Sequence, residues 1–157
     1  MNYYLPSPYA IKKNLDLREK NTLNQVKSLL NFSHFDPEWY FNKYKDIQDK
    51  IPCKDELIKS HFINSGYWEG RLPFKLSINK KFLERYYSSS LFNSETKRMD
   101  CYKIGALTSN IKFDLLFYND QFNHDGNSFV NKDDAFLHFL KIGYLKLKLP
   151  YDIQKDV

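Results

Sequence analysis

The sequence predicts an all-α fold: a short array of three helix-pair repeats preceded by an N-terminal capping helix. Three observations lead to this prediction. An aromatic-rich segment recurs along the chain, helix-capping residues precede apolar residues at helical spacing, and a glycine followed by a proline closes the units. No Gly-rich or Pro-rich linker divides the 157 residues, so we expect one compact domain.

The outer two copies of the repeat align in two blocks. FDPEWYFNKY at 35–44 matches FDLLFYNDQF at 113–122, and HFINSGY at 61–67 matches HFLKIGY at 138–144. The offset is 78 residues in the first block (113 − 35) and 77 in the second (138 − 61), so one residue is deleted between the blocks. Matched blocks in the same order indicate two copies of one structural unit.

A degenerate copy lies between the outer two. INKKFLERYY at 78–87 fits the first block, and CYKIGAL at 101–107 fits the second. The shared glycines, Gly66, Gly105 and Gly143, are then 39 and 38 residues apart. The expected organisation is an N-terminal arm and capping helix at 1–34, repeat 1 at 35–74, a degenerate repeat 2 at 75–110 and repeat 3 at 111–152.

Each repeat is predicted to be a pair of helices. In repeat 1, Asp36 is an N-cap residue and Pro37 occupies the first helical position, where its missing N–H costs little. A second helix is predicted at about 54–65, with its apolar residues toward one side. In repeat 3, Asn131 is the predicted N-cap of the second helix.

A glycine ends the second helix of each outer repeat. Gly66 and Gly143 stand where a left-handed C-cap is expected, and Pro73 and Pro150 stop the chain shortly afterwards. We therefore predict that both glycines are needed for their freedom to adopt a positive φ.

The first 34 residues differ from the repeats. Apolar residues between Leu23 and Leu30 fall at helical spacing and predict a helix from about Leu17 to Asn31. A two-helix unit cannot bury its apolar face alone, so the ends of an array need caps. We expect this helix to cover the exposed end of repeat 1.

Composition and charge exclude several function classes. The apolar share is 42%, and much of it is 13 Phe, 12 Tyr and 2 Trp, whose rings bury large areas. The net charge is +5, but the basic residues are interspersed with acidic ones and form no run of five or six. We therefore expect no nucleic-acid interface. No signal peptide pattern or long apolar segment occurs, so we expect no membrane span and a cytoplasmic location.

The first repeat also resembles a known family of sequence segments. The stretches FDPEWYFNKYKDI and HFINSGYWEGRLP resemble repeats of the form F-D-x-x-Y-Y…G-x-x-E-G-R-x-P. Such segments accompany glycosyltransferase domains in bacterial surface-polysaccharide proteins and also occur in proteins of large DNA viruses. The resemblance covers 35–73 well, 113–150 in part and 78–110 faintly. Lys45 stands where the family usually has proline, and copies two and three lack the Glu-Gly-Arg ending.

This resemblance implies a setting in glycan assembly rather than a reaction. The family's repeats are accessory segments, and no catalytic residue carries over from them. The chain also lacks the α/β pattern with acidic metal ligands or a Gly-rich phosphate loop that a nucleotide-sugar enzyme needs. We therefore expect a protein that is not an enzyme and that uses no cofactor and no metal. A viral member would lie in the host cytoplasm or the virion.

The candidates for contact with a ligand or a partner lie at the end of repeat 1, where its sequence departs from repeat 3 after the shared Gly-Tyr. They are Tyr67, Trp68, Glu69 and Arg71 on the helix-ending loop. Aromatic rings can stack on sugar rings, and Glu69 and Arg71 can bind a charged ligand. The favoured alternative is structural: Trp68 packs, and Arg71 ties the loop to a neighbouring helix through Asp46 or Asp36.

Two hypotheses about function follow from different classes. The first is a non-catalytic helical repeat module that binds a saccharide or docks glycosyltransferases. The second is a structural interaction protein, such as a virion or cell-surface assembly component, with no glycan role. The first predicts a saccharide or a glycosyltransferase as partner. The second predicts association through packing surfaces alone.

Overall fold

The structure is a computed structural model that describes residues 5–75, 113–122 and 128–156. These residues are mostly helical and form no sheet, which confirms the all-α prediction. The predicted repeat 2 lies, apart from its first residue, outside the described residues. The described α-helices are α1 (Pro8–Asn14), α2 (Lys20–Phe32), α3 (Pro37–Lys43), α4 (Asp55–His61), α7 (Leu115–Asp120) and α8 (Lys132–His138).

Two helices precede the first repeat. α2 corresponds to the helix predicted at about Leu17 to Asn31, and it buries Val26 and Leu30. α1 was not predicted from the sequence. Its N-cap is Ser7, whose side chain accepts a hydrogen bond from the Ala10 N–H, and Pro8 is its first residue. This is the same capping pattern as Asp36-Pro37, so a signal for α1 was present in the sequence.

The first repeat forms two helices with a short 3-10 turn, η1 (Lys45–Ile47), between them. The Asp36 carboxylate caps α3 by accepting a hydrogen bond of 3.0 Å from the Trp39 N–H, as predicted. α4 continues directly into a π-helical turn, η2 (Phe62–Gly66), so α4 and η2 together occupy the segment predicted as one helix.

The described part of the last repeat also has two helices, the second of which ends in a π-helical turn. α8 continues into a π-helical turn, η6 (Phe139–Gly143), which is followed by the 3-10 turns η7 (Tyr144–Lys146) and η8 (Ile153–Asp156). Asp114 caps α7 through a hydrogen bond of 3.0 Å from the Phe117 N–H. Asn131 caps α8 by accepting a hydrogen bond of 2.8 Å from the Asp133 N–H, as predicted.

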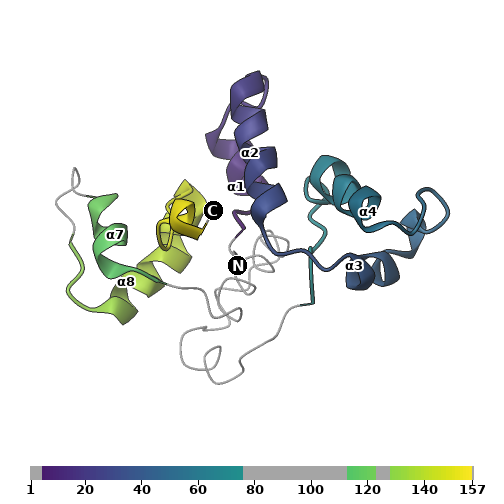
Figure 1. The fold of residues 1–157 in the computed structure, drawn as a ribbon. Helices are drawn as coiled ribbons and strands as arrows, with labels where there is room; N and C mark the ends of the chain where they lie inside the picture. Colours follow the sequence, from purple (N-terminus) through teal and green to yellow (C-terminus); the bar gives the residue numbers. More distant parts are fainter. Residues whose placement is uncertain (1–4, 76–112, 123–127, 157) are drawn as a thin grey trace.

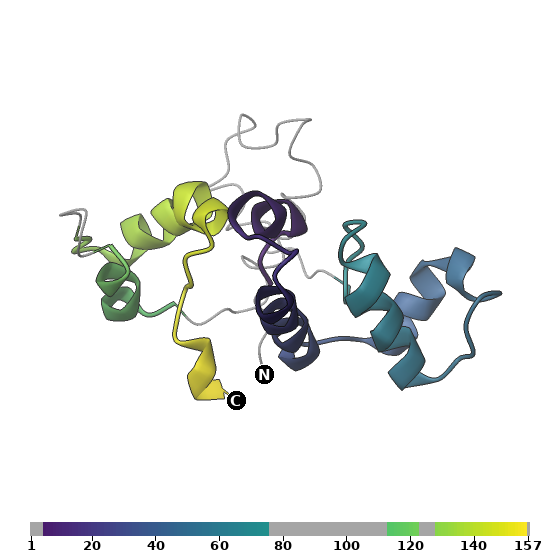
Figure 2. The same ribbon diagram turned by 90° about the horizontal axis from the view of Figure 1, so that it is seen from above.

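The N-terminal helices lie between the two helix pairs. Figures 1 and 2 show α1 and α2 with the α3–α4 pair on one side and the α7–α8 pair on the other. α2 packs against η2 of the first pair, and α1 packs against η7 of the second. One apolar cluster joins all three parts, with Leu30, Tyr40, Phe62, Tyr118, Phe139 and Tyr144 among its buried members.

The prediction that Gly66 and Gly143 are left-handed C-caps is wrong. Gly143 has φ −61° and ψ −39°, and Gly66 is not among the positive-φ residues. Each lies at the end of a π turn, and the chain continues through a further right-handed turn. The positive φ occurs later, at Gly70 (84°) and Leu147 (59°). The π turn adds one residue per hydrogen bond, so the helix ends later than an α-helical spacing predicts.

Candidate functional site

Each outer repeat contains a buried tyrosine that contacts a histidine. The Tyr40 hydroxyl lies 3.1 Å from His61 Nδ1, and the Tyr118 hydroxyl lies 2.8 Å from His138 Nδ1. We call these contacts the Tyr–His pairs. Burial raises the pKa of both tyrosines and lowers the pKa of both histidines, so both partners stay neutral near pH 7. In a neutral pair, a hydroxyl that donates to Nδ1 leaves the imidazole proton on Nε2.

The glycine at the end of each π turn lies against the tyrosine of the same pair. A Cβ added to Gly66 would overlap the Tyr40 hydroxyl and would lie 3.2 Å from Cζ of that ring. A Cβ added to Gly143 would overlap the Tyr118 hydroxyl in the same way. The structure therefore gives these glycines a role that spacing alone did not predict, because only a residue without a side chain leaves room for the tyrosine hydroxyl.

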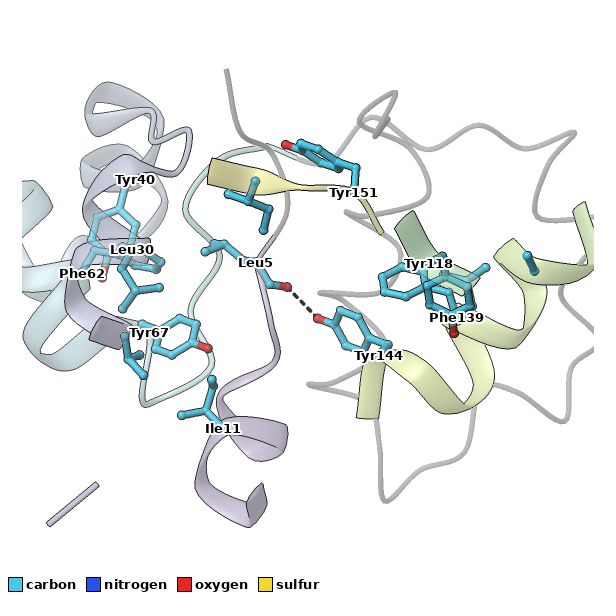
Figure 3. Packing of buried hydrophobic residues seen from close by; sticks show 14 of the residues in the cluster. Leu5, Ile11, Leu30, Tyr40, Phe62, Tyr67, Tyr118, Phe139, Tyr144 and Tyr151 are labelled. Atoms are coloured by element: carbon cyan, nitrogen blue, oxygen red, sulfur yellow. Dashed lines mark hydrogen bonds between the residues drawn. The ribbon is translucent and has the colours of Figure 1, made fainter. Parts of the chain in front are cut away.

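The loop tyrosines hold the N-terminal segment. Tyr67 is fully buried, and its hydroxyl donates a hydrogen bond of 2.6 Å to the Pro6 carbonyl. Tyr144, at the matching position of the last repeat, donates one of 2.9 Å to the Leu5 carbonyl. Figure 3 shows Leu5 between the two rings. The hydroxyls of the two repeats therefore bind consecutive carbonyls of one extended segment, and the ring of Tyr67 faces the interior.

Trp68 packs against α1. Its indole N–H donates a hydrogen bond of 3.1 Å to the Ile63 carbonyl, and its ring meets Tyr67 edge-on with centroids 5.0 Å apart. Lys12 Nζ lies 6.0 Å from the centre of the indole and donates to the Trp68 carbonyl at 3.3 Å. The indole is half-buried, so part of it remains accessible.

Arg71 ties the loop to the first helix pair. Its guanidinium forms a two-pronged ion pair with Asp46, at 3.0 and 2.8 Å, and a further contact of 2.8 Å with Glu69. It also lies 4.9 Å from the centre of the Tyr44 ring. Of the two partners considered from the sequence, the one in contact is Asp46. The hydrogen bonds from Arg71 lower the pKa of the Asp46 carboxyl, and those to Asp46 raise the pKa of Arg71.

The four predicted contact residues therefore lie on one loop but differ in exposure. Tyr67 is buried, the Arg71 side chain is 18% exposed, and the Glu69 side chain is 54% exposed. The contacts that the structure gives them are internal, within the loop or to α1, η1, η2 and the N-terminal segment. Their role toward an external ligand stays a prediction.

Sequence reasoning missed a groove between α2 and α4. Two adjoining open hollows of about 340 and 450 Å³ share Asn31, Glu56 and Lys59 as lining residues. Lys59 Nζ crosses from α4 to donate a hydrogen bond of 2.6 Å to the Asn31 carbonyl. Phe32, which is 54% exposed, lines the larger hollow. We call this feature the α2–α4 groove. The sequence carried no signal for it, because its two walls come from separate helices.

The described part of the chain holds neither a metal-binding cluster nor a membrane-spanning helix. Residues 5–75, 113–122 and 128–156 contain no group of three or more His, Cys, Asp or Glu side chains placed to hold a metal ion. Within the same ranges, no helix combines the length and the apolar character needed to cross a bilayer.

Comparison with known proteins gives no assignment. No protein-family model, no curated protein and no solved structure matches this chain. The function is therefore inferred from the chain's own residues and their geometry.

Proposed function

We propose that this chain is a non-catalytic helical repeat module in glycan assembly, which binds a saccharide or docks a glycosyltransferase. Its architecture in this proposal is three helix-pair repeats with the N-terminal helices as a cap. The module supplies a rigid surface, and any chemistry belongs to its partner.

The observation that carries the proposal is the matched use of motif residues in the two outer repeats. Asp36 and Asp114 cap equivalent helices, and their own N–H groups donate to the Pro73 and Pro150 carbonyls at 3.1 and 2.9 Å. The Tyr–His pairs and the loop tyrosines correspond in the same way. The residues that carry the resemblance to glycan-associated repeats therefore hold each helix pair together. This structural use is expected of an accessory repeat module.

The structural alternative has its own support. Tyr67 is fully buried and Arg71, which distinguishes repeat 1, is paired with Asp46, so both residues have a packing role without any ligand. In this alternative the chain is an interaction protein of a virion or cell surface with no glycan role. Its partners are then recognised through packing surfaces.

A paired experiment separates the two. The full chain is titrated with a panel of neutral and acidic oligosaccharides by calorimetry, and its self-association is measured by light scattering. Co-elution with glycosyltransferases encoded beside the gene tests the docking form. Saccharide binding or transferase co-elution is the expected result. Stable self-association with neither of these would contradict the proposal and favour the structural alternative.

A further inference from the structure

The α2–α4 groove has the dimensions of a ligand site. Its two hollows, of about 340 and 450 Å³, fall within the range of small-molecule pockets, which is roughly 300–1,000 Å³. They are open and meet at Lys59, whose ammonium group is held by the Asn31 carbonyl. Two adjoining open hollows suit a chain-like ligand better than a compact one, because a chain can enter from the side and span both.

The lining combines an exposed aromatic ring with hydrogen-bonding groups of both kinds. Phe32 presents a large apolar face at the larger hollow. Asn31 and Asn64 carry amide side chains that both donate and accept, Glu56 is an acceptor, and the Lys59 ammonium is a donor. A sugar ring has one apolar face and a rim of hydroxyls that both donate and accept. This set of side chains therefore matches a sugar.

The charges in the groove select among saccharides. The charged side chains that line it are Asp55, Glu56 and Lys59, two carboxylates against one ammonium. A negative balance repels uronic acids and phosphorylated sugars. We propose that the α2–α4 groove binds a neutral oligosaccharide, with Phe32 stacking on a sugar ring. This inference rests on the saccharide-binding form of the proposed function and moves its site away from the loop of Tyr67.

The position of the groove fits this assignment. It lies where the C-terminal end of α2 meets α4, and the Lys59–Asn31 contact fixes the two walls relative to each other. Pre-positioned walls reduce the entropy lost on binding. By contrast, Tyr67 on the loop is fully buried and the Arg71 side chain is only 18% exposed.

The test uses the full chain and four series of neutral oligosaccharides: cello-, malto-, manno- and chito-oligosaccharides of two to six sugars. Oligogalacturonate is the acidic comparison. Affinities are measured by calorimetry for the wild type, Phe32→Ala, Trp68→Ala and Tyr9→Ala. Tyr9 is a matched control, because its ring is 59% exposed, close to the 54% of Phe32, and it does not line the groove. Both rings are largely exposed, so we expect both variants to fold.

The expected result is binding of at least one neutral series, weakened about tenfold or more by Phe32→Ala and unchanged by Tyr9→Ala. Binding that survives Phe32→Ala but is lost in Trp68→Ala would overturn the groove and leave saccharide binding at the loop. A preference for oligogalacturonate would overturn the charge argument. If no neutral series binds, the groove proposal is wrong, and transferase co-elution alone then decides the docking form of the function.

Discussion

Replacing Gly66 with alanine tests whether these glycines are needed for space or for backbone freedom. The residue lies in a right-handed turn, where alanine is favoured over glycine by about 1 kcal/mol on helix propensity alone. A Cβ at this position would, however, overlap the buried Tyr40 hydroxyl and approach its Cζ to 3.2 Å. The two effects have opposite signs, so the sign of the change in unfolding free energy decides between them.

The magnitude follows from what the overlap displaces. Forcing an extra methyl into a packed core costs about 1–3 kcal/mol. Moving the Tyr40 hydroxyl away from His61 leaves a buried polar group unsatisfied, which costs about 1–3 kcal/mol more. After the gain in propensity, Gly66→Ala is expected to lower the free energy of unfolding by about 3 kcal/mol. For a chain of this length that corresponds to a fall in Tm of roughly 6–12 °C.

Urea unfolding of a double-mutant cycle measures this effect. In the Tyr40→Phe background the hydroxyl is absent, so Gly66→Ala should cost about 2 kcal/mol less than in the wild type. Gly70→Ala is the control, because it acts through a φ of 84°, costs about 1 kcal/mol, and should be indifferent to Tyr40→Phe. Gly143 and Tyr118 should repeat the coupling. A neutral or stabilising Gly66→Ala, or an equal cost in both backgrounds, would refute the reasoning.

Two further outcomes are expected. At position 147, where φ is 59°, Leu147→Gly should be more stable than Leu147→Ala by about 1 kcal/mol in urea unfolding, although glycine is normally the weaker choice in a turn of helix. The reverse order would show that the backbone is not strained there. The lowered pKa of His61 and His138 predicts full stability above their ordinary value of 6.5 and a loss as the pH falls below it, because the unfolded chain binds more protons there. Unfolding free energies that do not change between pH 7 and pH 5 would contradict this.

The helix starts were predictable from the sequence because their signals are local. A side chain that accepts from a backbone N–H two or three residues later needs no tertiary contact, so Asp36 and Asn131 could be recognised as N-caps. The same rule applied to Ser7-Pro8 would have found α1. The ion pair of Arg71 with Asp46 was foreseeable as one of two options, because its partners lie in the same repeat.

The role of the glycines was not predictable in this way. A glycine after a helix is the usual signal for a left-handed cap, and nothing in the sequence distinguishes that from a close approach by a side chain of another helix. Tyr40 and Gly66 belong to different elements, and only the packing of α3 against η2 brings the hydroxyl to the glycine. The α2–α4 groove could not be predicted from the sequence for the same reason, since its walls come from separate helices.

In both outer repeats a side chain accepts a hydrogen bond from the backbone N–H of the equivalent loop leucine, but the side chains differ. In the first, the Tyr44 hydroxyl accepts a hydrogen bond of 2.8 Å from the Leu72 N–H. In the last, phenylalanine stands at the position that matches Tyr44, and the Gln121 side chain accepts from the Leu149 N–H at 2.9 Å instead.

Both outer repeats also place a cationic side chain over the aromatic ring at this position, although the cation and the ring both differ. Arg71 lies over Tyr44, and Lys148 lies over Phe122 with Nζ 5.2 Å from the ring centre. Because the cation–ring contact persists when both residues change, a difference in residue type between the repeats is not by itself a sign of a lost ligand. A function specific to the first repeat is better sought outside the segments that match between the repeats, where repeat 1 adjoins α2. Phe32 and Asn31 of α2 lie there, beside Lys59.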